Sequence, residues 1–400
     1  MSQIDTRRLA WVVDNGIPLT PALRKLMGEV SVLPGRDINA STIVDADILL
    51  VRSITPITRG LLERSVVKFV ATATAGHDHV DAQALADLGI DWAAAPGSNA
   101  ISVLEYVLSA LAETQWLRAV LEGASVGVVG FGEVGRRLAE RLVAMGATVV
   151  AYDPFAVNWP SGIKRSDFEV VLQQPVVTLH ASLTDAGRHP SRNIIDIPQT
   201  QIMLKALAER PYGGLLINAA RGELISEPAL ERLLESGWTV VLDTWPGEPN
   251  LSAQRLAQCD WVSPHIAGHS AQAKPRGSDM IASAIAQWSQ HPDLSEAPTA
   301  DGVTTSRRVL KVPSLGSSAD AIDFLTAFLL EQSVLEREDT RLRNRASAGL
   351  SSGLFDKLRS QYQQPDEWTG QTVRLDGATR SSRTAMKTMG LQVLTDEGEM

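Results

Sequence analysis

Three side chains with complementary acid–base chemistry follow separate β-like runs in the second half of the chain. They are Arg221, Glu248 and His265, in the segments 218–222, 243–249 and 263–268. A guanidinium can pair with a carboxylate and polarise the carbonyl oxygen beside it. An imidazole can take a hydroxyl proton as a hydride leaves, and a carboxylate beside the imidazole fixes its tautomer. These residue types suit the oxidation of a 2-hydroxy acid, whereas each one alone could be an ordinary structural residue.

A glycine pattern upstream suits the binding of a dinucleotide. The segment Gly130-Phe131-Gly132-Glu133-Val134-Gly135 follows the β-like run 125–129 and opens a helical pattern at 133–144. The first glycine permits a tight turn, the second lets backbone approach a pyrophosphate, and the third lets helix and strand pack closely. Free N–H groups at the helix N-terminus favour phosphate. The complete strand–turn–helix context argues against a tight turn without a ligand.

Asp153 ends the next β-like run after the glycine pattern. A carboxylate at this point can accept hydrogen bonds from both ribose hydroxyls, and it repels a 2′-phosphate. The sequence therefore predicts NAD rather than NADP as the cofactor.

The elements that must position these residues alternate between strand and helix along the first three-quarters of the chain. Strands are expected at 9–13, 48–51, 68–71, 125–129, 148–152, 176–179, 215–217, 239–242 and 261–262, and helices at 21–27, 81–88, 100–121, 133–144 and 271–290. Such alternation is typical of parallel sheets built from βαβ units. Ligands bind outside the carboxyl ends of such strands, so residues distant in sequence can share one cleft.

The residue composition and the hydrophobic periodicity of the chain change after His291. Residues 292–318 hold Pro, Ser, Thr, Asp and Gly with little periodicity, which predicts a linker. A helix is expected at 319–338, and strands at 372–375 and 391–394 flank a helix at 382–389. The segment 319–400 is therefore predicted to be a small third domain.

Composition excludes several classes of protein. The chain has 400 residues and a net charge of −9, so nucleic acid is not an expected partner. No apolar run approaches the length of a membrane span, and the first residues lack the apolar core of a secretion signal. Cys259 is the single cysteine, which rules out an internal disulfide and a multi-cysteine zinc site. We expect a cytoplasmic protein. No metal site is predicted, because His77, Asp78, His79 and Asp81 fit a braced loop better than a ligand set.

The order of these motifs resembles that of the D-isomer-specific 2-hydroxyacid dehydrogenases, over about residues 9–290. The resemblance implies that Arg221, Glu248 and His265 are the catalytic set. It also implies an α/β fold with two doubly wound parallel-sheet domains, a flavodoxin-like substrate domain (1–99 and 270–291) and a Rossmann NAD domain (100–269). The cofactor-binding residues it implies are Gly130, Gly132, Glu133, Val134, Gly135, Asp153, Ala181, Ala219, Ala220, Arg221, Asp243 and Gly268.

Segments 51–55, 69–76, 94–100, 355–359 and 367–368 resemble one branch of this family, the erythronate-4-phosphate dehydrogenases. That resemblance implies oxidation of 4-phospho-D-erythronate to 3-hydroxy-2-oxo-4-phosphooxybutanoate, a step toward pyridoxal 5′-phosphate. It also implies a homodimer formed through a small α+β C-terminal domain. The substrate-binding residues it implies are Arg52, Ser53, Thr74, Gly76 and His269. Two positions depart from the pattern, because Ala181 replaces a Thr and His269 replaces a Tyr.

Other functions stay open from the sequence. The chain could act on another 2-hydroxy acid, such as phosphoglycerate, or it could be a non-catalytic NAD-sensing protein on the same scaffold. The tail could serve assembly alone. The basic stretch 341–345 is expected to be a solvated surface, or alternatively to send a cation into the active site of a partner subunit.

Overall fold

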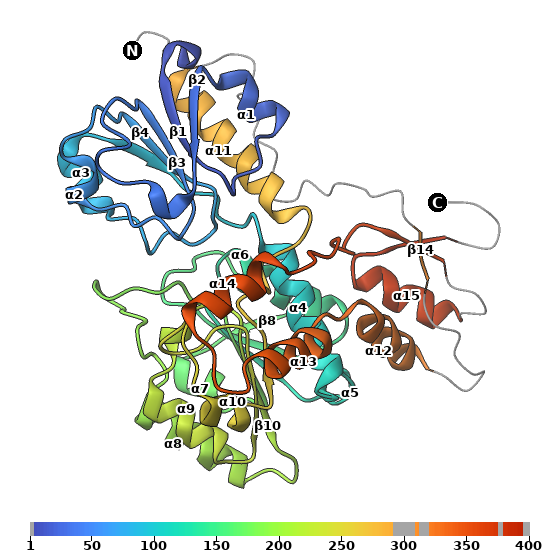
Figure 1. Ribbon diagram of the computed structural model, residues 1–400. Helices are drawn as coiled ribbons and strands as arrows, with labels where there is room; N and C mark the ends of the chain where they lie inside the picture. The colour runs from blue at the N-terminus through green and yellow to red at the C-terminus, as the bar shows by residue number, and fades with distance from the viewer. Residues whose placement is uncertain (1–3, 291–308, 312–319, 375–378, 395–400) are drawn as a thin grey trace. The chain divides into compact units, whose positions relative to one another are not determined.

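The structure, a computed structural model, describes residues 4–290, 309–311, 320–374 and 379–394 (Figure 1). The chain forms two compact units. The first is Met1–Asn99 with His269–Val303, and the second is Ala100–Gly268 with Thr304–Met400. The sequence predicted a first domain of residues 1–99 and 270–291 and a second of residues 100–269. The segment that we predicted as a third domain, 319–400, instead shares the second unit.

The first unit is built on a five-stranded sheet with the order β2-β1-β3-β4-β5, and all neighbouring strands are parallel. Its strands are β1 (Ala10–Asp14), β2 (Glu29–Leu33), β3 (Ile48–Val51), β4 (Phe69–Thr72) and β5 (Asp91–Ala93). One face is covered by α1 (Pro21–Leu26) and α11 (Ala273–Ser289), and the other by α2 (Arg59–Leu62) and α3 (Ala82–Leu88) (Figure 1). This order is the flavodoxin-like order, so that prediction is confirmed.

The second unit contains a seven-stranded parallel sheet with the order β12-β11-β10-β9-β6-β7-β8. Its strands are β6 (Val126–Val129), β7 (Val149–Tyr152), β8 (Ile163–Arg165), β9 (Val176–Leu179), β10 (Gly214–Asn218), β11 (Trp238–Leu242) and β12 (Trp261–Val262). The strand order reverses between β6 and β9, which is where a doubly wound sheet binds its ligand. The predicted Rossmann topology is confirmed.

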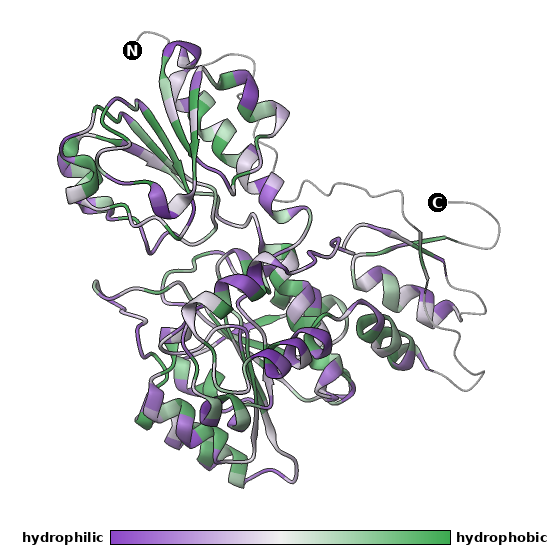
Figure 2. Cartoon of the chain, in the orientation of Figure 1, coloured by the Kyte–Doolittle hydropathy of each residue, from purple (hydrophilic) through white to green (hydrophobic). Residues whose placement is uncertain are grey.

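Helices cover both faces of this second sheet. Two buried apolar clusters join these helices to the sheet. One contains side chains of α4 (Ala100–Glu113), α5 (Trp116–Leu121) and α6 (Glu133–Ala144). The other contains side chains of α7 (Phe168–Leu172), α8 (Ile197–Ala208), α9 (Glu227–Leu234) and α10 (Ala253–Gln258). The central strands are hydrophobic along most of their length (Figure 2), as expected for strands buried on both faces.

Two helices predicted as continuous are broken. The helix expected at 100–121 is divided between α4 and α5, because Gln115 adopts a left-handed conformation with φ 62°. The helix expected at 319–338 is divided into α12 (Ala321–Gln332) and α13 (Leu335–Arg345). At that break Ser333 is extended, and its hydroxyl accepts the N–H of Leu335. We also missed β2, β5 and β8, edge strands of three to five residues in which few side chains are buried.

The tail adds two further helices, α14 (Ser352–Ser360) and α15 (Arg380–Thr388), and a three-stranded sheet. Its strands, in the order β13-β14-β15, are β13 (Val309–Lys311), β14 (Thr372–Arg374) and β15 (Gln392–Leu394). These strands are parallel, whereas the predicted α+β class usually has antiparallel strands. The predicted linker, 292–318, lies outside the described residues except for 309–311, which form β13.

The tail packs on residues 100–268 of the second unit through α12 and a buried carboxyl group. Phe328 of α12 is fully buried in the apolar cluster of α4 and α6, with its ring edge-to-face against Trp368. Glu105 of α4 accepts the backbone N–H groups of Thr369 (2.7 Å) and Trp368 (3.2 Å). Burial raises the pKa of Glu105 to about 8, and the charge of Glu367 nearby adds to this shift.

Because of Glu105, we expect the stability of the folded chain to fall as pH rises from about 4.5 to about 8. In this window the unfolded chain releases the Glu105 proton while the folded chain retains it, so ionisation favours unfolding. One group contributes a slope of at most about 1.4 kcal/mol per pH unit. Glu105→Gln should remove this contribution, which urea unfolding at pH 5, 6.5 and 8 would measure. Glu140→Gln, at an exposed site, is the control, and equal slopes in the parent and Glu105→Gln would contradict the expectation.

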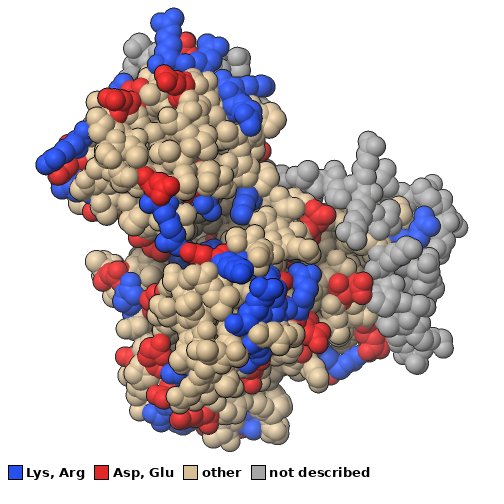
Figure 3. All heavy atoms as spheres, viewed as in Figure 1, with Lys and Arg blue, Asp and Glu red and all other residues tan. Residues whose placement is uncertain are grey.

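No helix in the described part of the chain has the length and apolar character needed to cross a membrane. Basic side chains gather on the face formed by α13 and α14 (Figure 3). Of the stretch predicted as a solvated surface, Arg345 is exposed as expected. The prediction is wrong for Arg341 and Arg343, which are part-buried and paired with Glu338 and Asp339.

Candidate active site

The turn between β6 and α6 combines one open glycine with two enclosed ones. Gly130 has φ 91°, and a Cβ atom there would stand 2.5 Å from the backbone nitrogen of Ala181. A Cβ at Gly135 would overlap the carbonyl oxygen of Gly130, so helix and strand pack as predicted. At Gly132 a Cβ would meet no atom of the described residues within 4 Å. Protein packing therefore does not require a glycine at position 132. A ligand that lay directly against this backbone would require one.

The N-terminus of α6 faces this turn. Gly132 is its N-cap residue and supplies no side chain to the first N–H groups of the helix. Glu133 in the first turn forms an ion pair with Arg137 of the same helix, and Val134 is partly buried. Backbone N–H groups rather than the side chain of Glu133 are therefore suited to hold a pyrophosphate here.

Asp153, at the end of β7, ties the glycine turn to the next loop. Its Oδ2 accepts the N–H of Phe131 (2.7 Å), and its Oδ1 accepts those of Phe155 (2.7 Å) and Ala156 (3.1 Å). A carboxylate has about four acceptor positions, so these bonds leave room for roughly one ribose hydroxyl.

Two aromatic side chains that the sequence did not single out for the cofactor connect the loops on either side of β6. Phe155 follows β7 and is 68% exposed, and its ring lies edge-to-face with that of His189 from the loop after β9 (centroids 5.5 Å apart). In the sheet, β7 and β9 flank β6, so these loops stand on both sides of the glycine turn. An exposed aromatic residue two positions after Asp153 was the signal available in the sequence.

His180 and Ala181 follow β9 and pack against Gly130. The Nε2 atom of His180 shares a hydrogen bond with the hydroxyl of Thr178 (2.9 Å). Burial lowers the pKa of His180 to about 3, so this imidazole is neutral at physiological pH. The backbone of Ala181 thus lines the turn, without the hydroxyl that the family pattern has there.

Arg221 lies just beyond β10 in a turn held by Asn218. The buried Asn218 side chain donates to the Arg221 carbonyl (2.9 Å) and accepts the N–H of Ala220 (3.2 Å). The Nη1 atom of Arg221 donates to the Ala220 carbonyl (2.9 Å), and Ala219 and Ala220 are partly buried. A Cβ at Gly222 would overlap the carbonyl oxygen of Trp245, so this turn packs directly on the loop that leads to Glu248.

Glu248 and His265 form the predicted pair. The Nδ1 atom of His265 lies 2.6 Å from Oε1 of Glu248, although they come from loops after different strands. His265 has φ 53°, a left-handed conformation that is uncommon outside glycine and concentrates at functional sites. Its side chain is 32% exposed, which leaves the imidazole accessible.

Asp243 holds the backbone around His265. The residue is 1% exposed, and its carboxylate accepts the Ser263 hydroxyl (2.6 Å) and the N–H groups of Ile266 (2.8 Å) and Ala267 (2.9 Å). The Tyr106 hydroxyl of α4 lies 2.8 Å from Ser263, which extends the network into the core. Burial raises the pKa of Asp243. We predicted Asp243 as a cofactor residue, and the structure gives its carboxylate a supporting role under the His265 loop. Gly268, at the end of that loop, is partly buried.

Asn218, Ser263 and Tyr106 are therefore supporting residues that sequence reasoning missed. Asn218 and Ser263 lie in the segments 218–222 and 263–268, so their positions beside Arg221 and His265 could have indicated a supporting role. For Tyr106, within an apolar helix, no signal was available.

The predicted substrate residues belong to the first unit and lie mostly at the ends of its strands. Arg52 follows β3 and forms an ion pair with the buried Asp14 (2.8 Å), and Ser53 is exposed. Thr74 follows β4, and its hydroxyl donates to the Gly76 carbonyl (2.8 Å). His269 is partly buried. Arg52 and Thr74 thus place a cation and a hydroxyl group after the neighbouring strands β3 and β4, and such groups suit an anionic ligand.

The loop after β4 braces itself as predicted. His79 Nε2 shares a hydrogen bond with Thr72 (3.0 Å), and the His77 ring contacts that of Trp92. Among the described residues, no group of three or more His, Cys, Asp or Glu side chains could hold a metal ion.

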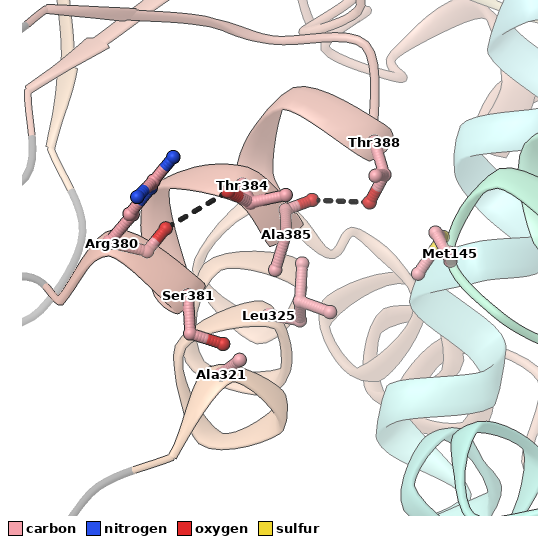
Figure 4. A pocket seen from close by; sticks show the side chains of 8 residues that line it. All are labelled: Met145, Ala321, Leu325, Arg380, Ser381, Thr384, Ala385 and Thr388. Carbon is pink, nitrogen blue, oxygen red and sulfur yellow. Dashed lines mark hydrogen bonds between the residues drawn. The ribbon is translucent and has the colours of Figure 1, made fainter.

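A pocket of about 500 Å³ lies elsewhere, in the tail (Figure 4). It is lined by Met145 after α6, Leu325 of α12, and Arg380, Thr384 and Ala385 of α15. None of the predicted catalytic, cofactor or substrate residues lines it.

Comparison with known proteins identifies relatives along nearly the whole chain. Residues 105–267 match the family described as D-isomer specific 2-hydroxyacid dehydrogenase, NAD binding domain. The chain is 37% identical over 385 residues to an erythronate-4-phosphate dehydrogenase of Yersinia pestis (strain Pestoides F), which covers 92% of this chain and 95% of the relative.

Solved structures share the fold at low sequence identity. The NAD+-bound 3-phosphoglycerate dehydrogenase of Entamoeba histolytica has a TM-score of 0.56 and 21% identity, over 72% of this chain and 98% of that one. The TT0316 protein of Thermus thermophilus has a TM-score of 0.57 and 22% identity, over 68% and 94% of the two chains.

Proposed function

Because the chain belongs to the family of D-isomer-specific 2-hydroxyacid dehydrogenases, we propose that it oxidises 4-phospho-D-erythronate with NAD as the hydride acceptor. The product is 3-hydroxy-2-oxo-4-phosphooxybutanoate. The observation that carries this proposal is the contact between Glu248 and His265 at the edge of an NAD-binding sheet. The substrate is supported by the relative named for erythronate 4-phosphate, whose similarity covers 92% of this chain.

The residues around the glycine turn fit NAD. A pyrophosphate fits the open position at Gly132 and the start of α6, where no side chain caps the first N–H groups. A ribose hydroxyl fits the remaining acceptor position of Asp153. When bound, NAD takes up the hydride from C2 of the substrate at its nicotinamide ring.

His265 is the proposed general base. Its Nδ1 atom faces the Glu248 carboxylate, so Nδ1 carries the hydrogen of that bond and Nε2 is the basic nitrogen. The proton of the C2 hydroxyl moves to Nε2 as the hydride leaves, and the C2–O bond becomes a carbonyl. Glu248 holds the ring in this tautomer and balances the positive charge that forms on it.

Arg221 is the proposed partner of the substrate carboxylate. Its planar guanidinium can hold a carboxylate with two hydrogen bonds and polarise the neighbouring C2 oxygen. Arg52, held by Asp14, is the proposed partner of the phosphate, with Ser53, Thr74, Gly76 and His269 as further substrate contacts.

We further propose a homodimer formed through the tail and a cytoplasmic location. The similarity to an erythronate-4-phosphate dehydrogenase over 92% of this chain supports the first. The single cysteine, a buried free thiol, is consistent with the second.

The purified chain, given NAD and 4-phospho-D-erythronate, should produce NADH, followed by its ultraviolet absorbance. We expect kcat/KM to exceed the values for D-erythronate and D-3-phosphoglycerate by at least roughly 100-fold, because unpaired polar groups in the site disfavour analogues that cannot fill it. Faster turnover of 3-phosphoglycerate would reassign the substrate. NAD binding without turnover of any of the three acids would favour an NAD-sensing protein instead.

A further inference from the structure

A segment of the tail lies on both loops that carry the catalytic pair. We call residues 335–360 the brace; it comprises α13, α14 and their connection, and it packs on residues 100–268 of the same unit (Figure 1). Leu342 and Leu350 of the brace, with Phe355 and Leu358, belong to the same apolar cluster as Trp245 and Leu251.

The brace holds the Glu248 loop at both ends. On one side, Trp245 is fully buried and its ring lies edge-to-face with that of Phe355 (centroids 5.8 Å apart, 89° between planes). On the other side, Leu251 and Leu350 exchange two backbone hydrogen bonds of 3.0 and 2.6 Å. Glu248 lies between these two contacts, and its N–H donates to the Trp245 carbonyl (3.2 Å).

The brace also holds the segment that leads to His265. Oδ1 of Asp339 accepts the N–H of Val262 (2.8 Å), three residues before His265. Arg343 pairs with Asp339 (2.7 Å) and donates to the carbonyls of Leu256 (2.9 Å) and Cys259 (2.8 Å). The loops that carry Glu248 and His265 thus both contact the brace.

From this geometry we infer that Phe355 is a positioning residue for the Glu248–His265 pair, acting through Trp245. This inference rests on the role of the pair in the proposed function. The Glu248 loop is a short turn whose backbone is tied to Trp245, so withdrawal of the Phe355 ring lets Trp245 and the turn shift together. A catalytic group misplaced by about 1 Å can lose roughly 100-fold in rate.

Phe355→Ala is expected to lower kcat by roughly 10- to 100-fold, with the Kd for NAD unchanged within about twofold. The chain offers a matched control in Phe328→Ala. Phe328 is also a tail phenylalanine in an edge-to-face pair, with Trp368 at 5.5 Å and 87°, but it belongs to the other apolar cluster. Phe328→Ala should lower the midpoint of thermal unfolding and change kcat by less than about twofold.

A double mutant separates positioning from general destabilisation. If Phe355 acts through Glu248, Phe355→Ala should cost less than about twofold when Glu248 is already Gln. A full 10- to 100-fold loss on top of Glu248→Gln would overturn the inference, and so would parent-like kcat in Phe355→Ala. Should the alanine variant not fold, Phe355→Leu tests the same idea, with a smaller loss expected and no loss contradicting it.

A second readout does not depend on turnover. In protein with ¹³C-labelled histidine, the His265 ring resonance, assigned with His265→Asn, should move in Phe355→Ala toward its position in Glu248→Gln. It should stay in place in Phe328→Ala. If the parent chain turns over none of the acids, the proposed function fails, while this resonance still decides whether Phe355 positions the pair; an unmoved resonance overturns the inference.

Discussion

Replacement of His265 with asparagine is expected to lower kcat by roughly 10²- to 10⁴-fold, the contribution typical of a general acid–base residue. The Kd for NAD should stay within about twofold, because the glycine turn and Asp153 lie on other loops. The physical reason is the loss of Nε2 as the acceptor of the hydroxyl proton, which then has no base in reach. NADH formation under saturating substrate, together with NAD titration of protein fluorescence, measures both quantities.

Asparagine is the right substitute because His265 has φ 53°. Asparagine adopts the left-handed conformation more readily than alanine does, so the loop and its hydrogen bonds to Asp243 are retained. Thermal unfolding of the variant should therefore match that of the parent. Near-normal kcat in a folded His265→Asn protein would remove His265 from the mechanism.

Gly132→Val should weaken NAD binding by roughly 100-fold while leaving the fold intact. A Cβ atom at this position meets no described atom of the protein within 4 Å, so we expect the fold to accept a side chain there. A bound pyrophosphate must instead lie against this backbone, and crowding of that kind costs about 2–3 kcal/mol. Such a cost corresponds to roughly 30- to 150-fold in Kd, measurable by calorimetry.

Gly135→Ala is the contrasting variant in the same turn. Its Cβ overlaps the carbonyl oxygen of Gly130, so α6 must move away from β6. We expect the midpoint of thermal unfolding to drop by several degrees, as a loss of about 1–3 kcal/mol would produce. Tight NAD binding by Gly132→Val would show that the cofactor does not approach the turn at this point, and would remove the strongest structural support for the NAD site.

Much of the site could be predicted because its residues follow strands directly. Gly130, Asp153, Arg221 and His265 lie one to three residues beyond β6, β7, β10 and β12, and parallel strands end at one sheet edge. The prediction was less complete where side chains act on one another. The family resemblance implied that Asp243 contacts the cofactor, and only the structure shows that its carboxylate accepts hydrogen bonds from Ser263, Ile266 and Ala267.

The amino-acid sequence by itself determined the two parallel-sheet folds, the glycine turn and the choice of Arg221, Glu248 and His265 as the proposed catalytic set. These depend on local chemistry, namely apolar runs of strand length, glycines where backbone must be bare, and acid–base groups at strand ends. Only the tertiary structure decided that Glu248 and His265 touch, that Asp243 supports their loop, and that Phe355 and Asp339 of the tail pack beneath them. Such contacts join residues far apart in the chain, and they arise from how the buried surfaces fit together rather than from any local pattern.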